Sequence, residues 1–181
     1  MSTTAVEAGT PVTAAPRRAV TGAAVLRWLG GGLLAGVAWG VAARLWMRYL
    51  ADVPSFSWEG TLFILGLTGV AGLALGGVEL LRRRGVGAWR VLLVVPALVM
   101  FAGQGLPFLP CAVLGGLAVS GRGGPGVRLP AALLAASPVV MFWVLDVDVP
   151  HSLTVTALWF LALGAALAVA WAPLWRRRAS R

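Results

Sequence analysis

Long apolar runs separated by short polar segments dominate the chain. Four of these runs reach the length of about 17–25 residues that a helix needs to cross a bilayer core of about 30 Å. They lie at about residues 23–50, 61–81, 129–145 and 153–175. Apolar residues follow one another in these runs instead of alternating with polar ones over a few positions, which predicts membrane-spanning helices and not strands.

The stretch at residues 88–120 is harder to divide. It is long for a single span, and the segment 103–107 (GQGLP) interrupts it. Glycine and proline together are typical of a turn or a helix break. Two short spans, at about 88–104 and 106–121, would form a tight hairpin here. The alternative is one long kinked helix, which would give five spans in all.

Arginine placement favours six spans over five. The chain carries 15 basic residues, all of them arginine. With six spans, 13 of the 15 fall on one side of the membrane, and the opposite loops hold Asp52, Glu59, Asp146 and Asp148. Loops rich in arginine stay in the cytoplasm. We therefore predict an all-α, polytopic transmembrane helix bundle of six spans with both termini cytoplasmic.

This threading divides the chain into three parts. Residues 1–22 are small, polar and proline-containing and are predicted to form a disordered cytoplasmic tail, residues 23–175 the transmembrane helical domain, and residues 176–181 a basic cytoplasmic tail. The composition agrees, because 59% of the residues are hydrophobic and 12% are charged, whereas soluble domains carry about 25% charged residues. These values exclude a water-soluble enzyme and a disordered protein.

Glycines recur every four residues in the first two predicted spans. A glycine face lets two helix backbones approach closely, which favours helix association where lipid offers no hydrophobic drive. One interpretation is packing within the bundle, and the alternative is a homodimer interface on the first span. The candidate packing residues are Gly32, Gly36 and Gly40 in the first span and Gly72 and Gly76 in the second.

Two arginines lie at the opposite end of the first span from the others. Arg44 and Arg48 are one helical turn apart, and Asp52 continues the same i, i+4 row. Glu59 follows across a short loop, at the start of the next helix. This candidate polar cluster at the outer face has two interpretations. The arginines reach the lipid headgroups and pin the hairpin through a salt bridge, or they bind an anion, a headgroup or a substrate.

The same region carries a resemblance to a protein family. The pattern R-L-W-M-R followed by D-x-P-x-F-S-W-x-G-T-L, over about residues 43–64, resembles a motif of uncharacterised small multipass bacterial inner-membrane proteins. The resemblance implies an inner-membrane location and no particular activity. Where those proteins often have an acid before the phenylalanine, this chain has Ser55. The resemblance also implies that five residues act as a unit: Arg44, Arg48, Phe56, Trp58 and Gly60.

Other polar residues predict no catalytic site. Glu79 has Arg82 and Arg83 at i+3 and i+4, which favours a local salt bridge over a proton-coupling carboxylate. Residues 146–151 hold two aspartates and one histidine in a single loop. A solvated acidic loop is the better interpretation there, because a metal site needs further ligands. We expect no metal and no cofactor.

Three functional classes stay open. A structural, accessory or assembly protein is favoured by the glycine faces and by the absence of ionisable groups at mid-membrane. The alternatives are a small transporter or channel and a membrane enzyme acting on lipid. The net charge of +9 reflects membrane topology, not nucleic-acid binding. The expected partners are the lipid bilayer with its anionic headgroups and a second copy or a membrane protein.

Overall fold

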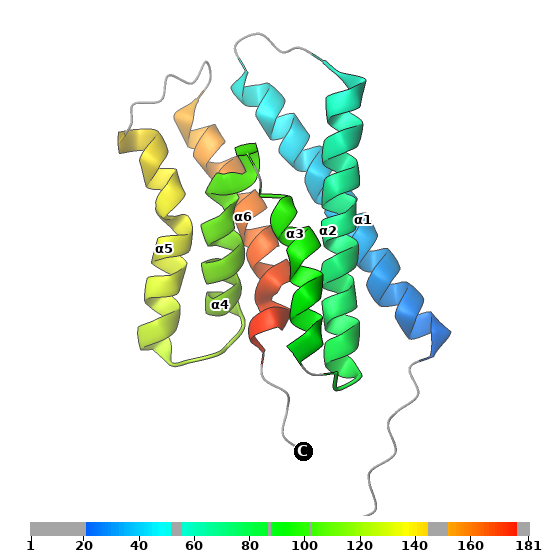
Figure 1. The fold of residues 1–181 in the computed structure, drawn as a ribbon. Coiled ribbons are helices and arrows are strands. Elements are labelled where there is room, and N and C mark those ends of the chain that lie inside the picture. The colour runs from blue at the N-terminus through cyan, green and yellow to red at the C-terminus, as the bar shows by residue number, and fades with distance from the viewer. Residues whose placement is uncertain (1–20, 52–55, 87, 102, 145–151, 177–181) are drawn as a thin grey trace, which may run out of the picture.

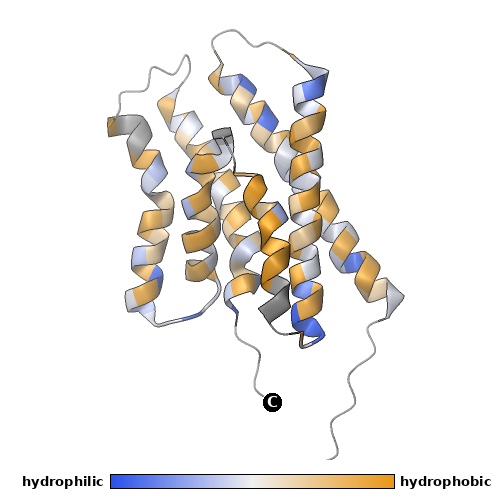
Figure 2. Cartoon of the chain, viewed as in Figure 1, coloured by the Kyte–Doolittle hydropathy of each residue, from blue (hydrophilic) through white to orange (hydrophobic). Residues whose placement is uncertain are grey.

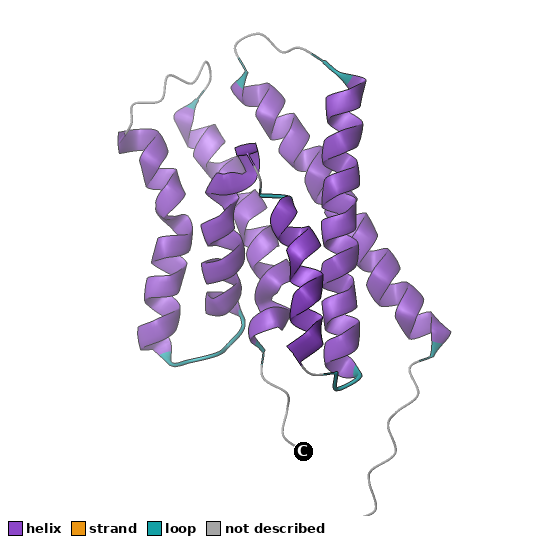
Figure 3. Cartoon of the chain, viewed as in Figure 1, coloured by secondary structure: helices purple, strands orange, loops and turns teal. Residues whose placement is uncertain are grey.

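The chain is helical throughout the residues that the structure describes. A computed structural model describes residues 21–51, 56–86, 88–101, 103–144 and 152–176, and no strand occurs within these ranges. Figure 3 shows the helices and their short connections. The predicted all-α class is therefore confirmed.

Three helices are long and apolar enough to cross a membrane: α1 (Gly22–Leu50), α2 (Trp58–Arg83) and α6 (Leu153–Trp175). A fourth apolar helix, α5 (Pro125–Val144), is shorter. All four fall on the runs that the hydropathy pattern predicts. Their length follows from that pattern, because within a membrane a helix satisfies every backbone polar group inside its own segment.

Capping and proline placement explain why two helices begin earlier than the pattern predicts. The side chain of Ser57 accepts a hydrogen bond from the Gly60 N–H at 3.1 Å, so α2 begins at Trp58 instead of residue 61. Serine is a favoured residue at this position because its side-chain oxygen can accept an N–H of the first helical turn. Helix α5 begins at Pro125 instead of residue 129. Proline suits a first turn because its missing N–H would have no helical partner there.

Between residues 88 and 119 the chain is broken into short helical pieces instead of forming one long helix. The first leg is a 3-10 turn, η1 (Ala88–Leu93), followed by α3 (Val94–Val99). A second 3-10 turn, η2 (Gly103–Phe108), leads to the second leg. That leg is a π-helical turn, η3 (Cys111–Gly115), continued by α4 (Gly116–Val119). Figure 1 shows the two legs running in opposite directions.

These legs are shorter than the predicted spans at 88–104 and 106–121. The α-helix of the first leg ends at Val99, and helical structure resumes at Gly103 as the 3-10 turn η2. Pro107 and Pro110 cannot donate backbone hydrogen bonds, which keeps this region from forming a continuous α-helix. The hairpin is thus present, but its legs are less regular helices than the sequence pattern predicts.

The helices are arranged side by side with alternating direction. In Figure 1 the start of α1 and the end of α6 lie at the same end of the bundle. The α1–α2 pair forms one side, α4, α5 and α6 form the other, and α3 lies between them. Helix α1 crosses α2, so that its two halves lie on opposite sides of α2 in this view.

Aromatic side chains connect α1 to α6 in the core. Phe108 is 1% exposed, and its ring stacks on Phe160 with centroids 4.4 Å apart. The rings of Trp39 and Trp46 meet Phe108 edge-on at 5.6 and 5.5 Å. The Trp39 Nε1–H donates to the Leu163 carbonyl of α6 at 3.0 Å, and the Trp46 Nε1–H donates to another carbonyl of α6 at 3.4 Å. Buried indole N–H groups usually find such partners.

Large apolar side chains also cover the outside of the bundle. Leu26, Leu34 and Val144 are 75%, 71% and 73% exposed. Figure 2 shows that hydrophilic residues gather toward the helix ends and that the middle of the bundle is mostly apolar. A helix that is apolar on the face it exposes is typical of a membrane environment. Together with the three long apolar helices, this surface indicates a membrane protein.

Candidate functional site

The predicted outer cluster is only partly brought together. The Arg44 Nε–H donates to Thr61 Oγ1 at 3.3 Å, and the Thr61 hydroxyl donates to the Ser57 carbonyl at 2.8 Å. The guanidinium carbon of Arg48 lies 5.4 Å from the centre of the Phe56 ring. Arg44 therefore contacts the beginning of α2 through a hydrogen bond, and Arg48 lies over the aromatic face of a residue just before α2.

The acidic half of that cluster is not joined to the arginines where the structure describes it. Glu59 is exposed, and within the described ranges no ion pair links it to Arg44 or Arg48. Asp52 lies outside the described residues. Phe56 and Trp58 meet edge-on with centroids 4.8 Å apart, so aromatic contacts and the Ser57 cap hold the residues at the beginning of α2 and just before it.

The five candidate packing glycines lie where α1 and α2 cross. A Cβ at Gly32 or Gly36 would overlap backbone atoms of α2, and a Cβ at Gly72 or Gly76 would overlap backbone atoms of α1. At Gly40 it would overlap the Thr68 hydroxyl. Backbone atoms cannot move aside, so close approach here requires glycine. The glycine face of α1 is thus covered by α2 of the same chain.

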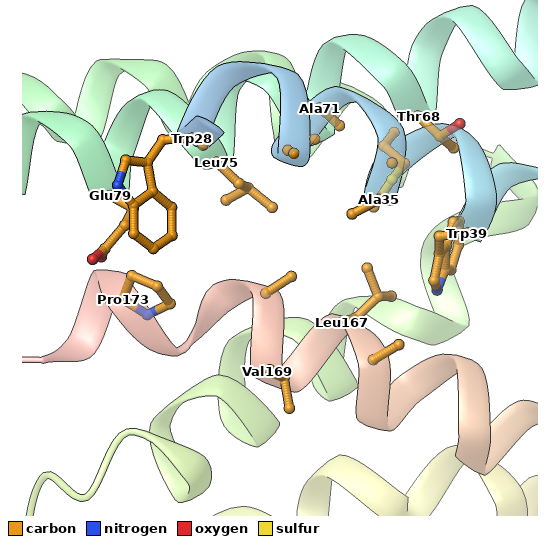
Figure 4. Close-up of a pocket in the computed structure, with 18 of the residues that line it drawn as sticks. Trp28, Ala35, Trp39, Thr68, Ala71, Leu75, Glu79, Leu167, Val169 and Pro173 are labelled. Carbon is orange, nitrogen blue, oxygen red and sulfur yellow. The ribbon is translucent and has the colours of Figure 1, made fainter. Parts of the chain in front are cut away.

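A wedge-shaped cavity of about 720 Å³ lies between α1, α2 and α6. Because α1 crosses α2, its first half lies away from α6 (Figure 1). Further along α1, the hydrogen bond between Trp39 and Leu163 holds α1 against α6. Figure 4 shows Trp28, Glu79 and Pro173 at one end of this space and Trp39 at the other. We call it the α1–α6 wedge. Its lining includes Arg27, Trp28, Ala35, Trp39, Ala71, Leu75, Glu79, Arg83, Met100, Ala166, Leu167, Ala170 and Arg176.

One end of the wedge is polar and highly connected. Glu79 is 5% exposed, and its carboxylate accepts two N–H bonds from Arg82 at 2.7 Å each and one from Arg83 at 2.6 Å. These pairs confirm the predicted local salt bridge. The guanidinium groups of Arg27 and Arg83 lie 5.3 and 4.4 Å from the Trp28 ring centre. Cation–π contacts of this kind hold both cations beside the indole.

The body of the wedge is apolar. Ala71, Leu75, Met100 and Leu167 line it, and Trp39 closes its deep end with the indole N–H turned to α6. Thr68 is the polar side chain at this depth, and its hydroxyl donates to the Ile64 carbonyl of its own helix at 2.9 Å. The interior therefore offers dispersion contacts and few hydrogen-bonding groups.

Metal-ligand geometry is absent from the described residues. No group of three or more His, Cys, Asp or Glu side chains comes together there. The loop with Asp146, Asp148 and His151 lies outside the described residues. Cys111 is buried, and its S–H donates to the Ala135 carbonyl at 3.1 Å, so it packs α5 against the second leg of the hairpin.

Comparison with known proteins yields no relative. No family model matches the chain, and neither curated proteins nor solved structures match it. The functional argument therefore rests on the geometry alone.

Sequence reasoning missed the α1–α6 wedge. Its rims carry small residues at helical spacing, namely Gly31 and Ala35 on α1 and Ala166 and Ala170 on α6. The same spacing of small residues is found where helices pack closely, so the pattern alone does not distinguish a helix–helix interface from the lining of a cavity.

Proposed function

We propose that this chain is a six-span protein of the bacterial inner membrane with a non-catalytic, accessory or assembly role. Both termini lie in the cytoplasm in this proposal. Anionic headgroups on the cytoplasmic side and a membrane partner protein are its proposed contacts. The three long apolar helices support it, as does the position of the start of α1 and the end of α6 at the same end of the bundle in Figure 1.

The single observation that carries the non-catalytic part is the state of Glu79. It is the one buried charged side chain among the described residues, and both of its oxygens are engaged by Arg82 and Arg83. A carboxylate that accepts three N–H bonds from two arginines is engaged in a structural ion pair and is poorly suited to carry protons. Neither a nucleophile–base pair nor a free acid lines the described interior.

Charge distribution supports the orientation. Arg27, residues 82–84, Arg122, Arg128 and Arg176 belong to one end of the described bundle, and Arg44 and Arg48 belong to the other. Arginine-rich ends stay in the cytoplasm during insertion.

Reporter fusions test the proposed topology. Fusions after residues 55, 86, 105, 125, 149 and 181 are expected to alternate outside, inside, outside, inside, outside and inside. A fusion after residue 181 that reports outside would contradict the six-span arrangement and would place the error in the hairpin at residues 88–119, where the helical legs are short.

The α1–α6 wedge specifically favours one alternative, a small transporter of an amphiphile. A cavity of this volume is within the range of about 300–1,000 Å³ that is usual for ligand sites. The two roles predict different rates of lipid movement across the bilayer. In vesicles of neutral lipid, the accessory role predicts that the purified chain leaves the flipping rate of a fluorescent anionic phospholipid unchanged, whereas a transporter would accelerate it.

A further inference from the structure

The α1–α6 wedge opens along the side of the bundle and not only at its end. Gly31 and Ala35 on α1 are exposed, and so are Ala166 and Ala170 on α6, yet all four line the cavity. These residues form its two rims. Because both helices are long and apolar enough to cross a membrane, a lateral opening between them faces the lipid tails of the surrounding bilayer.

The polar end of the wedge has more positive than negative charge. Three arginines and one glutamate line it, and the glutamate is already committed to Arg82 and Arg83. Within the described residues, Arg27 and Arg176 have no ion-pair partner, and both are exposed. Two guanidinium groups, one on α1 and one on the residue that follows α6, therefore have no acidic partner in the described structure and can bind an anion at the mouth.

The apolar body of the wedge matches the hydrocarbon chain of an anionic lipid, and its cationic mouth matches the lipid headgroup. A hydrocarbon chain gains contacts from Leu75, Met100 and Leu167 without leaving any buried polar group unpaired, because the Thr68 hydroxyl bonds to its own helix. A phosphate at the mouth pairs with guanidinium groups, which match its oxygens bidentately. A free phosphate ion would leave the apolar body unfilled.

The volume argues against a partner helix in the wedge. A spanning helix about 30 Å long and 10 Å across occupies about 2,400 Å³, more than three times the cavity of about 720 Å³.

We propose that the α1–α6 wedge binds one anionic phospholipid from the bilayer. One acyl chain enters between α1 and α6 as far as Trp39, and the phosphate pairs with Arg27 and Arg176 at the mouth. The lipid is a resident ligand that fills a gap in the helix packing and ties α1 to α6 on the arginine-rich side. This inference does not depend on the accessory role proposed above.

Native mass spectrometry of the full chain in a neutral detergent tests the proposal. Phosphatidylglycerol and phosphatidylcholine with identical chains are added in turn, and the lipid-bound fraction is measured. We expect one tightly held phosphatidylglycerol with an affinity at least tenfold higher than that of phosphatidylcholine. Equal affinity for the two lipids would overturn the proposal, because it would mean unspecific solvation of an apolar surface.

Charge variants assign the headgroup contact. The double variant Arg27→Gln and Arg176→Gln is expected to lose the preference for phosphatidylglycerol, whereas Arg122→Gln is expected to keep it. Arg122 is the matched control because it is an exposed arginine at the same end of the bundle and does not line the cavity. Equal losses in the two variants would show a general charge effect and would overturn the assignment.

Filling the wedge tests the chain contact separately. Ala170→Phe on its rim is expected to lower the bound fraction of both lipids at least fivefold, and Ala132→Phe is expected to change neither. Ala132 is an exposed alanine of α5 outside the cavity, so both variants place a ring on an exposed helix face. Unchanged binding in Ala170→Phe would overturn the proposal, as would displacement of the bound lipid by an equal concentration of inorganic phosphate.

Discussion

Near the arginine-rich end, Glu79 is held by ion pairs within its own helix, and the sequence spacing already specifies them. Glu79 meets Arg82 and Arg83 because residues three and four positions apart share one face of a helix. The two pairs differ in exposure, since the Arg82 side chain is 19% exposed and that of Arg83 is 50% exposed. Arg82 also donates twice and Arg83 once. The two arginines should therefore contribute unequally to stability.

We expect Glu79→Gln to lower the free energy of unfolding by about 1.5–3 kcal/mol, because hydrogen bonds to a charged group are lost in a buried setting. Arg82→Ala should cost more than Arg83→Ala, whose half-exposed pair is worth at most about 1 kcal/mol. Unfolding in detergent measures all three, with the exposed Arg84→Ala as control. A larger loss in Arg83→Ala than in Arg82→Ala would contradict this order.

At the scale of elements, the α1–α2 pair depends on glycine at particular positions. Gly36 faces the Thr68 carbonyl and the backbone of Gly72, whereas a Cβ at Gly31 meets nothing within 4 Å. Two glycines of one helix, five residues apart, thus have opposite roles. Of these two, Gly36 helps to set the distance between the helices, and Gly31 leaves room at the rim of the wedge.

The variant Gly36→Ala is expected to destabilise the protein by about 1–3 kcal/mol, because an extra methyl group is forced against backbone that cannot repack. Gly31→Ala should be neutral or stabilising by up to about 1 kcal/mol, since alanine favours helix over glycine. Thermal unfolding of both variants in the same detergent checks this contrast. Similar destabilisation by the two substitutions would rule out the close approach at Gly36.

The whole molecule is shaped by two contacts that pull α1 in different directions. Its glycines pack closely against α2 where the two helices cross. Beyond that crossing, the indoles of Trp39 and Trp46 form hydrogen bonds to α6. A rigid helix held in this way cannot follow both neighbours along its whole length. The α1–α6 wedge is the space that results.

Trp39→Phe tests the contact that closes the deep end of the wedge. Phenylalanine keeps an aromatic ring beside Phe108 but removes the donor to the Leu163 carbonyl, so we expect a loss of about 0.5–1.5 kcal/mol. The control is Trp58→Phe, because Trp58 is 70% exposed. Denaturant unfolding measures both. An equal loss at the two positions would mean that the indole bond does not join α1 to α6.

The sequence by itself determined the helical class, the approximate limits of the four long apolar helices, the arginine asymmetry and the Glu79 pairs. Each of these depends on hydropathy or on residues within one turn of one another, so the spacing along the chain contains the necessary information. The tertiary structure alone decided that Arg48 lies over Phe56, that the glycines of α1 meet those of α2, and that a cavity separates the first half of α1 from α6. Those features depend on how helices cross. In a chain that is apolar on nearly every helix face, hydropathy cannot select the crossing, and close packing of backbone and side chains does.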